Sequence, residues 1–338
     1  MELSGMILAG AEYEPIEGRL IVENGEITAI EERETDSSDI ICPSFVNAHT
    51  HIGDSIAKEA GRGLSLDELV APPDGLKHRL LAEADRDELV ESMRRSLQCM
   101  MAGGTTTFIE FREGGVDGVH ALTAAAESLD IEPLIMGREE LEVLEVADGY
   151  GASGARDADF TDERTAARRA GKLFGIHAGE RDPDDITPAL DLDPDFLVHM
   201  VHAEPSHLDR VENEGIPIAV CPRSNLVTGV GVPPIAELLE HTTVALGTDN
   251  VMLNSPSMFR EMEFVSKLCD VSAPEVLRMA TAAGAEIIGL NCGILEPGRD
   301  AGILVLDGDS DNLVGVRDPV RGVVRRAGTG DVKSVIFP

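Results

Sequence analysis

Aromatic residues and paired cysteines are scarce in this sequence. Tryptophan is absent, and two tyrosines and nine phenylalanines bring the aromatic share of the 338 residues to 3%. A flat ligand would therefore have to stack on a phenylalanine such as Phe111, and the composition neither supports nor excludes a heterocyclic ligand. The five cysteines are odd in number and contain no C-x-x-C pair, which argues against a disulfide framework or a zinc ribbon. We expect them to be small buried residues in a reducing compartment.

Long apolar segments are also missing. No run of about 20 uncharged apolar residues is present, so we expect no transmembrane helix and no membrane partner. The first residues, M-E-L-S-G, lack the basic and apolar regions that begin a signal peptide. We therefore expect a cytoplasmic protein.

Positive charge is the third deficit. The chain has 62 acidic and 28 basic residues, a formal net charge of −34 and an isoelectric point near 4.4. So acidic a chain repels nucleic acid and anionic membranes, which we exclude as partners. The carboxylates are spread through a chain that is 43% hydrophobic, so the chain is not a disordered acidic tail. This excess of acid is typical of halophilic proteins, whose high internal salt screens self-repulsion.

The length suits a TIM barrel of about 250 residues with a smaller appended domain. Residues 19–30 indicate a β-hairpin with an Asn-Gly turn, and 302–307 and 332–337 are also strand-like. We expect the two chain ends, 1–40 and 296–338, to form one small β-sandwich.

Between residues 41 and 295, apolar strand-like runs alternate with helical patterns. The strand candidates are 43–48, 105–111, 131–137, 173–178, 196–201, 217–221 and 243–248. The helical patterns include 86–102, 118–129, 162–171 and 205–214. A further strand is needed between 139 and 155, where the pattern is weak. Such alternation predicts a parallel sheet, and eight units close a barrel, so the fold class is α/β with a TIM (β/α)8 barrel.

Catalytic groups of a TIM barrel lie at the C-terminal ends of its strands. The first strand ends in His49 and His51, whose i, i+2 spacing puts both rings on one face of an extended segment. Two neutral ring nitrogens there could bind one divalent ion. Taken alone, a structural pair of histidines explains the spacing equally well.

Three further strand ends carry ionisable groups. His177 closes the fifth strand, and Glu180 follows it as a nearby acid or base. His199 directly follows the apolar run of the sixth strand, and His202 falls at the start of the next loop. Asp249 follows the eighth strand, where it could ligate a metal, accept a proton or cap a helix. Each signal alone is ambiguous, but together the three histidines and the aspartate of strands 1, 5 and 8 form a set of metal ligands.

At these residues the chain resembles the amidohydrolase superfamily. More narrowly, it is similar to the branch of cytosine deaminases, S-adenosylhomocysteine deaminases and chlorohydrolases. The matching segments are 43–54 (PSFVNAHTHIGD), 102–107 (AGGTTT), 177–180 (HAGE), 198–202 (VHMVH), 221–225 (CPRSN), 246–250 (LGTDN) and 296–306 (EPGRDAGILVL). They span essentially the whole chain. The chain is short for this branch, and Gly302 replaces the family's usual aspartate at a position that looks structural.

The resemblance implies a metal site and a set of roles. Glu180 would shuttle protons, and His199 would orient the attacking water or polarise the substrate. Relatives with two metals bridge them with a modified lysine on strand 4, and none lies between Lys77 and Lys172, so we expect one ion. Zn²⁺ is favoured, with Fe²⁺ as the alternative. The implied ligands are His49, His51, His177 and Asp249.

These roles predict a hydrolase of carbon–nitrogen bonds other than peptide bonds. The ion would lower the pKa of a bound water, and Asp249 and His199 would hold and deprotonate that water. The resulting hydroxide would attack an sp² carbon while Glu180 protonates the ring nitrogen and the leaving amine. We favour a deaminase that releases ammonia from an aminated heterocycle. The alternatives are a hydrolase of a cyclic amide or imidazolone, similar to imidazolonepropionase, and a non-catalytic barrel, which would lack ligands.

Seven residues are candidates for contact with a small-molecule substrate. Residues 53–85 are long for a barrel connection and could form a lid; they contain Lys77 and His78, which a surface turn explains equally well. Arg112 and Arg138 follow the second and third strands, where ion pairs with neighbouring glutamates are the other explanation. The remaining candidates are His202, Arg223 and Asn225, of which the last two gain support from the resemblance. Homodimers are common among relatives, and a homodimer is possible for this chain as well.

Overall fold

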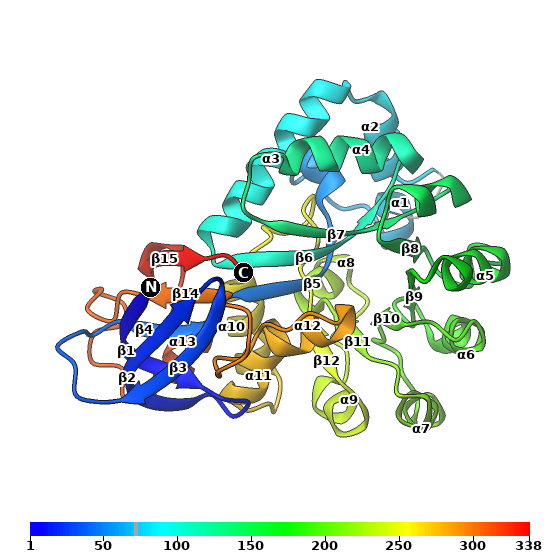
Figure 1. Ribbon diagram of the computed structural model, residues 1–338. Helices are drawn as coiled ribbons and strands as arrows, with labels where there is room; N and C mark the ends of the chain where they lie inside the picture. The colour runs from blue at the N-terminus through cyan, green and yellow to red at the C-terminus, as the bar shows by residue number, and fades with distance from the viewer. Residues whose placement is uncertain (71–73) are drawn as a thin grey trace. The chain divides into compact units, whose positions relative to one another are not determined.

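The computed structural model describes residues 1–70 and 74–338 (Figure 1). Two compact units divide the chain. The first comprises Met1–Asn47, Cys99–Thr107 and Ser257–Pro338, and the second comprises Ala48–Gln98 and Phe108–Pro256. The domain boundaries expected near residues 40 and 296 stay a prediction.

The first unit is built on a six-stranded sheet made from both chain ends. Its strands are β1 (Glu2–Ala9), β2 (Glu14–Glu23), β3 (Glu26–Glu32), β4 (Ile40–Pro43), β14 (Ile303–Leu306) and β15 (Val332–Ile336). Their order is β15-β14-β4-β1-β2-β3, with β1 and β4 parallel and the other pairs antiparallel. The predicted hairpin is β2–β3. The predicted small β-domain from both chain ends is this six-stranded sheet, in which β4 joins β1 to β14.

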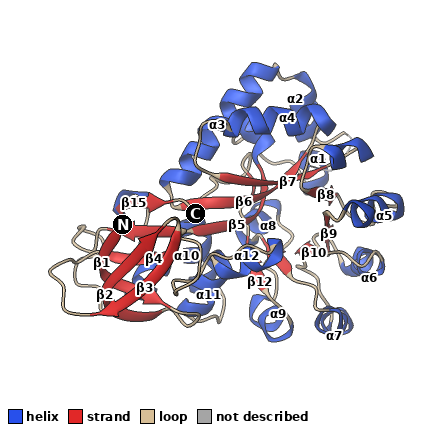
Figure 2. Ribbon diagram, in the orientation of Figure 1, coloured by secondary structure: helices blue, strands red, loops and turns tan. Residues whose placement is uncertain are grey.

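The same unit contains four helices, drawn in blue in Figure 2. They are α10 (Met258–Leu268), α11 (Ala273–Ala280), α12 (Ala282–Ile288) and α13 (Pro319–Arg325), with a 3₁₀ turn η4 at Thr329–Asp331. Ser272 and Glu275 form a capping box at the start of α11. One face of the sheet buries Ile7, Leu20 and Ile303 in an apolar cluster.

A nine-stranded parallel sheet carries the predicted barrel strands. They are β5 (Phe45–His51), β6 (Thr105–Arg112), β7 (Glu132–Gly137), β8 (Gly149–Ala152), β9 (Leu173–Ala178), β10 (Phe196–His199), β11 (Ile218–Val220), β12 (Val244–Leu246) and β13 (Asp249–Asn250). Their order is β12-β11-β10-β9-β8-β7-β6-β5-β13. Because β12 pairs with β11 and β13, three residues later, pairs with β5, the sheet closes on itself as a barrel. The weakly signalled strand between 139 and 155 is β8.

Helices follow the strands of the second unit, as the sequence predicted. They are α1 (Leu66–Val70), α2 (Leu76–Glu83), α3 (Arg86–Ala102), α4 (Gly115–Ala126), α5 (Thr161–Ala170), α6 (Ile186–Asp191), α7 (Pro205–Glu214), α8 (Pro222–Thr228) and α9 (Ile235–His241), with 3₁₀ turns η1 (Ile52–Ala57), η2 (Leu141–Glu145) and η3 (Pro183–Asp185). Figure 1 shows α5, α6, α7 and α9 outside the strands β9 to β12. Among the described residues, no helix is both long and apolar enough to cross a membrane.

The predicted lid at 53–85 is ordered into η1, α1 and α2, apart from residues 71–73, which lie outside the described residues. Strands β7, β10, β11 and β12 are shorter than predicted. Strand β10 ends at His199 because His199 and Met200 have left-handed φ angles of 80° and 52°.

Candidate metal centre and active site

Two histidines at the end of β5 begin the site. His49 and His51 flank Thr50 on the extended strand, and their exposed fractions are 0% and 3%. Close packing fixes this segment, because a Cβ atom at Gly247 would lie 2.7 Å from the Cβ atom of His49. A glycine is therefore required where the chain passes His49 on its way to Asp249.

His177 closes β9 and is oriented by the neighbouring strand. Its Nδ1 atom lies 2.8 Å from the carbonyl oxygen of Ala152, the last residue of β8. A neutral imidazole that donates its Nδ1 proton to this carbonyl keeps the Nε2 lone pair free for a metal ion. His51 has the corresponding arrangement, with its Nδ1 atom 2.8 Å from Oε1 of Glu113.

Asp249 and His199 both occupy the left-handed region of backbone conformation, with φ angles of 58° and 80°. Such conformations are costly for residues other than glycine and gather at functional sites. The Asp249 carboxylate accepts hydrogen bonds from Ser224 Oγ at 2.7 Å and from Asn250 Nδ2 at 2.9 Å. Neighbouring groups therefore fix its direction.

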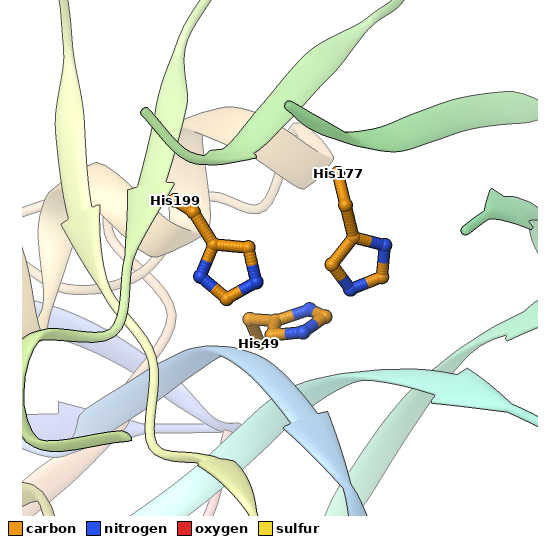
Figure 3. A group of neighbouring side chains, drawn as sticks. All are labelled: His49, His177 and His199. Carbon is orange, nitrogen blue, oxygen red and sulfur yellow. The ribbon is translucent and has the colours of Figure 1, made fainter. Parts of the chain in front are cut away.

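The candidate ligands converge on one place. Figure 3 shows the rings of His177 and His199 directed toward His49. Donor atoms within 4.8 Å of one another come from three overlapping groups: His49, His177 and His199; His49, His51 and Asp249; and Glu180, His199 and Asp249. The structure thus brings together all four expected ligands and both expected catalytic neighbours.

The donor set fits a divalent metal ion. Neither ring nitrogen of His49 makes a hydrogen bond within the described part of the chain, although the ring is fully buried. A buried imidazole without partners is costly unless a ligand satisfies it. Three imidazoles and one carboxylate are a donor set that suits zinc and other first-row metals.

The protonation states also suit metal binding. Burial lowers the pKa of His49 and His177, and it lowers that of His51 to about 3. The three rings are therefore neutral near pH 7, which is the form that ligates a metal. Burial alone would raise the pKa of Asp249, but contact with His49 and the neighbouring imidazoles outweighs it and holds the pKa well below its usual value.

Glu180 and His199 share one amide. Asn225, on α8, donates from Nδ2 to Glu180 Oε1 at 3.2 Å, and the same atom lies 3.1 Å from His199 Nδ1. Contact with the Nδ2 donor makes His199 Nδ1 an acceptor, so the proton of a neutral ring sits on Nε2, 3.6 Å from Glu180 Oε2. Burial raises the pKa of Glu180, which favours the protonated form that a general acid needs.

A buried carboxylate, Glu113, collects the positive groups beside the site. Its Oε1 atom lies 2.6 Å from Lys77 Nζ, 3.0 Å from Arg138 Nη1 and 2.8 Å from His51 Nδ1. Burial alone would raise its pKa, but Lys77, His51 and Arg138 together hold the pKa well below its usual value. Glu113 therefore links one candidate ligand to two cations.

Two further buried carboxyl groups hold the backbone around the ligands. Glu110 accepts hydrogen bonds from Thr50 Oγ1 at 2.6 Å and from the Ile52 backbone at 2.8 and 2.9 Å. Asp54 accepts one from the Met252 backbone at 2.9 Å. Burial raises the pKa of Glu110 to about 7 and that of Asp54 well above its ordinary value.

A cavity of about 100 Å³ opens above the ligands. Lys77 and Arg138 line it together with the candidate ligands His51, His177 and Asp249, in positions where a substrate could meet them. Asn225 lies behind it and positions Glu180. Phe111 packs edge-on against His49 and His177 and is outside the lining, so it offers no stacking face to a substrate.

The other predicted contacts lie away from this lining. His78 Nε2 contacts the Val70 carbonyl at 3.1 Å, and Arg112 donates from Nε to the Gly118 carbonyl at 3.1 Å. Arg223 donates to the Ser255 carbonyl at 2.7 Å, and His202 bonds through its backbone to Gly179. These four residues are not among those that line the cavity, and their contact with substrate stays a prediction.

Sequence reasoning missed the roles of Glu113, Glu110 and Asn250. Glu113 was considered as an ion-pair partner of Arg112, yet the shorter contacts join it to Lys77 and Arg138. A signal was available, since Glu110 and Glu113 stand at the end of a buried strand beside the first histidine pair.

The family model described as "Amidohydrolase family" matches residues 40–337. An uncharacterised protein of Methanocaldococcus jannaschii is 35% identical over 367 residues, which covers 98% of this chain and 96% of that protein. A putative aminohydrolase of Archaeoglobus fulgidus is 38% identical over 331 residues, covering 95% and 92%. A 5-methylthioadenosine/S-adenosylhomocysteine deaminase of Haloarcula marismortui is 28% identical over 376 residues, covering 93% and 85%.

Solved structures have the same fold. Atrazine chlorohydrolase from Arthrobacter aurescens, complexed with zinc, superposes with a TM-score of 0.83 at 21% identity and covers 99% of this chain and 93% of that one. Guanine deaminase from C. acetobutylicum, with bound guanine, gives 0.83 at 15% identity and covers 99% and 98%.

Proposed function

This chain belongs to the amidohydrolase family, and from that premise and the geometry of the site we propose that it is a metal-dependent hydrolytic deaminase of an aminated heterocycle. One observation carries the proposal. The donor atoms of buried neutral imidazoles and of an ionised aspartate lie in overlapping groups, within 4.8 Å of one another in each group. The carboxyl group of Glu180 lines the cavity beside them. These groups would supply the metal ligands, the proton carrier and the substrate space that hydrolytic deamination needs.

A single divalent ion would be held by His49, His51, His177 and Asp249. When bound, the ion supplies Lewis acidity that brings the pKa of water toward neutrality. Zn²⁺ suits this set, with Fe²⁺ as the alternative, and zinc is bound in the chlorohydrolase of the same fold. No lysine stands at the end of β8 to bridge a second ion, since that strand ends in Ala152.

Asp249 and His199 orient the attacking water. The carboxylate of Asp249 is held by Ser224 and Asn250, so it accepts a hydrogen bond from the water in one direction. His199 presents its Nε2–H to the cavity because Asn225 occupies Nδ1. This N–H donates to the water or to the oxygen that forms on the substrate carbon.

Glu180 carries two protons from the water to the substrate. The first passes through its carboxyl group to the ring nitrogen as the C–O bond forms at the carbon that bears the amino group. The second passes to the amino nitrogen as the C–N bond breaks, and ammonia leaves with the bonding electron pair. A carboxyl group with a raised pKa suits both transfers.

The names of similar proteins support deamination more than the opening of a cyclic amide. The Haloarcula marismortui relative is named as a deaminase, and putative aminohydrolases are among the relatives that are more than 30% identical. Both reactions use the same residues, so product analysis must separate them.

The test is ammonia release by zinc-loaded protein in molar KCl. The panel contains aminopyrimidines, aminopurines, pterins and aminotriazines, with chelator-treated protein and a His49→Ala variant as controls. We expect ammonia from at least one ring class and none from either control. If fully metal-loaded protein releases no ammonia from any ring but opens a cyclic amide or imidazolone, deamination is the wrong reaction.

A further inference from the structure

The cavity lining contains two kinds of charged group, and this concerns the substrate of the proposed deaminase. Glu180 follows β9, His199 ends β10 and Asp249 begins β13, and these three residues carry the chemistry. The same lining contains two cations, Lys77 from α2 and Arg138 after β7. A substrate in this cavity can present its amino-bearing carbon to the first three residues and another group to the two cations.

The two cations are built into the protein. The Lys77 and Arg138 residues are 3% and 8% exposed, so neither is a surface charge in contact with bulk water. Both donate to the same oxygen, Oε1 of Glu113, and Lys77 also donates to Asn250 Oδ1 at 3.1 Å. These contacts hold the two side chains in place before any ligand arrives.

Glu113 does not use all the hydrogen-bond donors of Lys77 and Arg138. It is the one carboxylate within 4 Å of Lys77 and Arg138 in the described part of the chain, and it does not itself line the cavity. A guanidinium has five N–H donors, and Glu113 engages only Nη1 of Arg138. The remaining donors and part of the Lys77 ammonium group are therefore available on the cavity side.

Other lining residues do not offer an equal site. The cations Arg156 and Arg181 are paired with Asp182 and Asp67. None of the described lining residues is a phenylalanine or a tyrosine, and Leu66 and Val70 contribute apolar surface. Lys77 and Arg138 are therefore the lining groups best suited to bind an anionic group of the substrate.

We infer that the substrate is a small ring that carries an oxyanion, a carboxylate in the simplest case, which Lys77 and Arg138 bind. The inference rests on the proposed function for its reacting end. Paired ammonium and guanidinium groups bind a carboxylate by charge-assisted hydrogen bonds, which are about twice as strong as neutral ones. The cavity of about 100 Å³ has room for a small ring.

Calorimetry on the zinc-loaded protein tests this without any turnover. The probes are uracil and uracil-6-carboxylate, which have the form of a deaminated ring and differ only in the carboxylate. We expect the carboxylate to bind about ten-fold tighter or better, as one hydrogen bond between charged groups implies. Equal binding of the two probes, or tighter binding of uracil, would overturn the inference.

Substitutions of Lys77 and Arg138 test whether these two residues cause the preference for the carboxylate probe. Lys77→Met and Arg138→Gln should each reduce the affinity ratio toward one, and Arg138→Lys should restore part of it. Arg79→Met is the matched control, because Arg79 lies on the same helix, α2, and is exposed away from the cavity lining. Zinc content and circular dichroism must match wild type in each variant.

The outcomes separate this inference from the proposed function. A preference that persists in both Lys77→Met and Arg138→Gln would mean that the metal alone holds the carboxylate, and the inference would be wrong. A Lys77-dependent preference in a protein that releases no ammonia would leave the inference standing and remove the deaminase. Deamination of neutral rings without any carboxylate preference would do the reverse.

Discussion

Three of the four histidines of the centre have a partner at their Nδ1 atom. His177 faces the Ala152 carbonyl, His51 faces Glu113, and His199 faces Asn225. These partners fix which nitrogen carries the proton, and they leave Nε2 directed to the centre. The geometry of the site is therefore set by neighbours of the ligands as much as by the ligands.

At this scale the clearest prediction concerns Glu180. A Glu180→Gln substitution keeps an acceptor for Asn225 but removes the titratable proton. We expect turnover to fall by about 10² to 10⁴ fold, the usual worth of general acid–base catalysis, while bound metal stays at the wild-type level. Steady-state ammonia release and elemental analysis on the same preparation measure both. A variant that keeps most of its activity would show that another group moves the protons.

Gly247 gives a second prediction. An alanine there would place its Cβ atom 2.7 Å from His49 Cβ and 2.8 Å from His49 N, so the β5 segment must shift. We expect Gly247→Ala to lower zinc affinity by about ten-fold or more, as loss of ligand alignment does. Competition with a fluorescent chelator measures the affinity. Gly330→Ala is the control, since a Cβ atom there meets nothing within 4 Å; equal affinity in both variants would contradict the role of Gly247.

At the scale of elements, the tips of β5 and β6 are joined by Glu110. Its side chain accepts hydrogen bonds from Thr50 and Ile52, on either side of the ligand His51. Burial raises its pKa from 4.5 to about 7. The protonated form is thus the one that the folded state favours.

The raised pKa of Glu110 makes the free energy of unfolding depend on pH. Because the pKa is higher in the folded state, the contribution of Glu110 to stability is full below about pH 4.5 and is lost as pH rises through about 7. The loss is about 3 kcal/mol. In metal-free protein we therefore expect Glu110→Gln to gain stability relative to wild type between pH 5 and pH 8, measured by urea unfolding. The same stability difference at both pH values would contradict the raised pKa.

Much of the element order could be predicted from sequence because strand ends follow apolar runs. His49, His177, His199 and Asp249 stand directly at such ends, so their meeting in a barrel was predictable. Strand β8 was weakly signalled because it has four residues, two of them glycine. Its position followed only from the need for an eighth strand.

Side-chain partners across the barrel could not be predicted in this way. Local spacing suggested Arg138 with its neighbour Glu139, but Glu139 has a φ angle of 79° and accepts a hydrogen bond from the Gly114 backbone. Arg138 instead meets Glu113, 25 residues away in sequence. Lys77 reaches the same carboxylate from α2. Such contacts depend on how strands and loops meet in three dimensions.

At the scale of the whole molecule, a net charge of −34 destabilises the compact state through self-repulsion. Self-repulsion acts over a Debye length of about 10 Å at 0.1 M salt and about 3 Å at 1 M. We expect the unfolding temperature to rise by several degrees between about 0.1 and 2 M KCl, measured by calorimetry. Sucrose is the uncharged control, because it acts by exclusion and not by screening. An unfolding temperature that falls with KCl would contradict this expectation.

We propose that one buried centre holds one catalytic ion. Titration of metal-free protein with Zn²⁺, followed by calorimetry and by elemental analysis after dialysis, measures the number of sites. We expect one tight site per chain, lost in His49→Ala and in Asp249→Asn. Two tight sites per chain, or a single site that survives both substitutions, would contradict it.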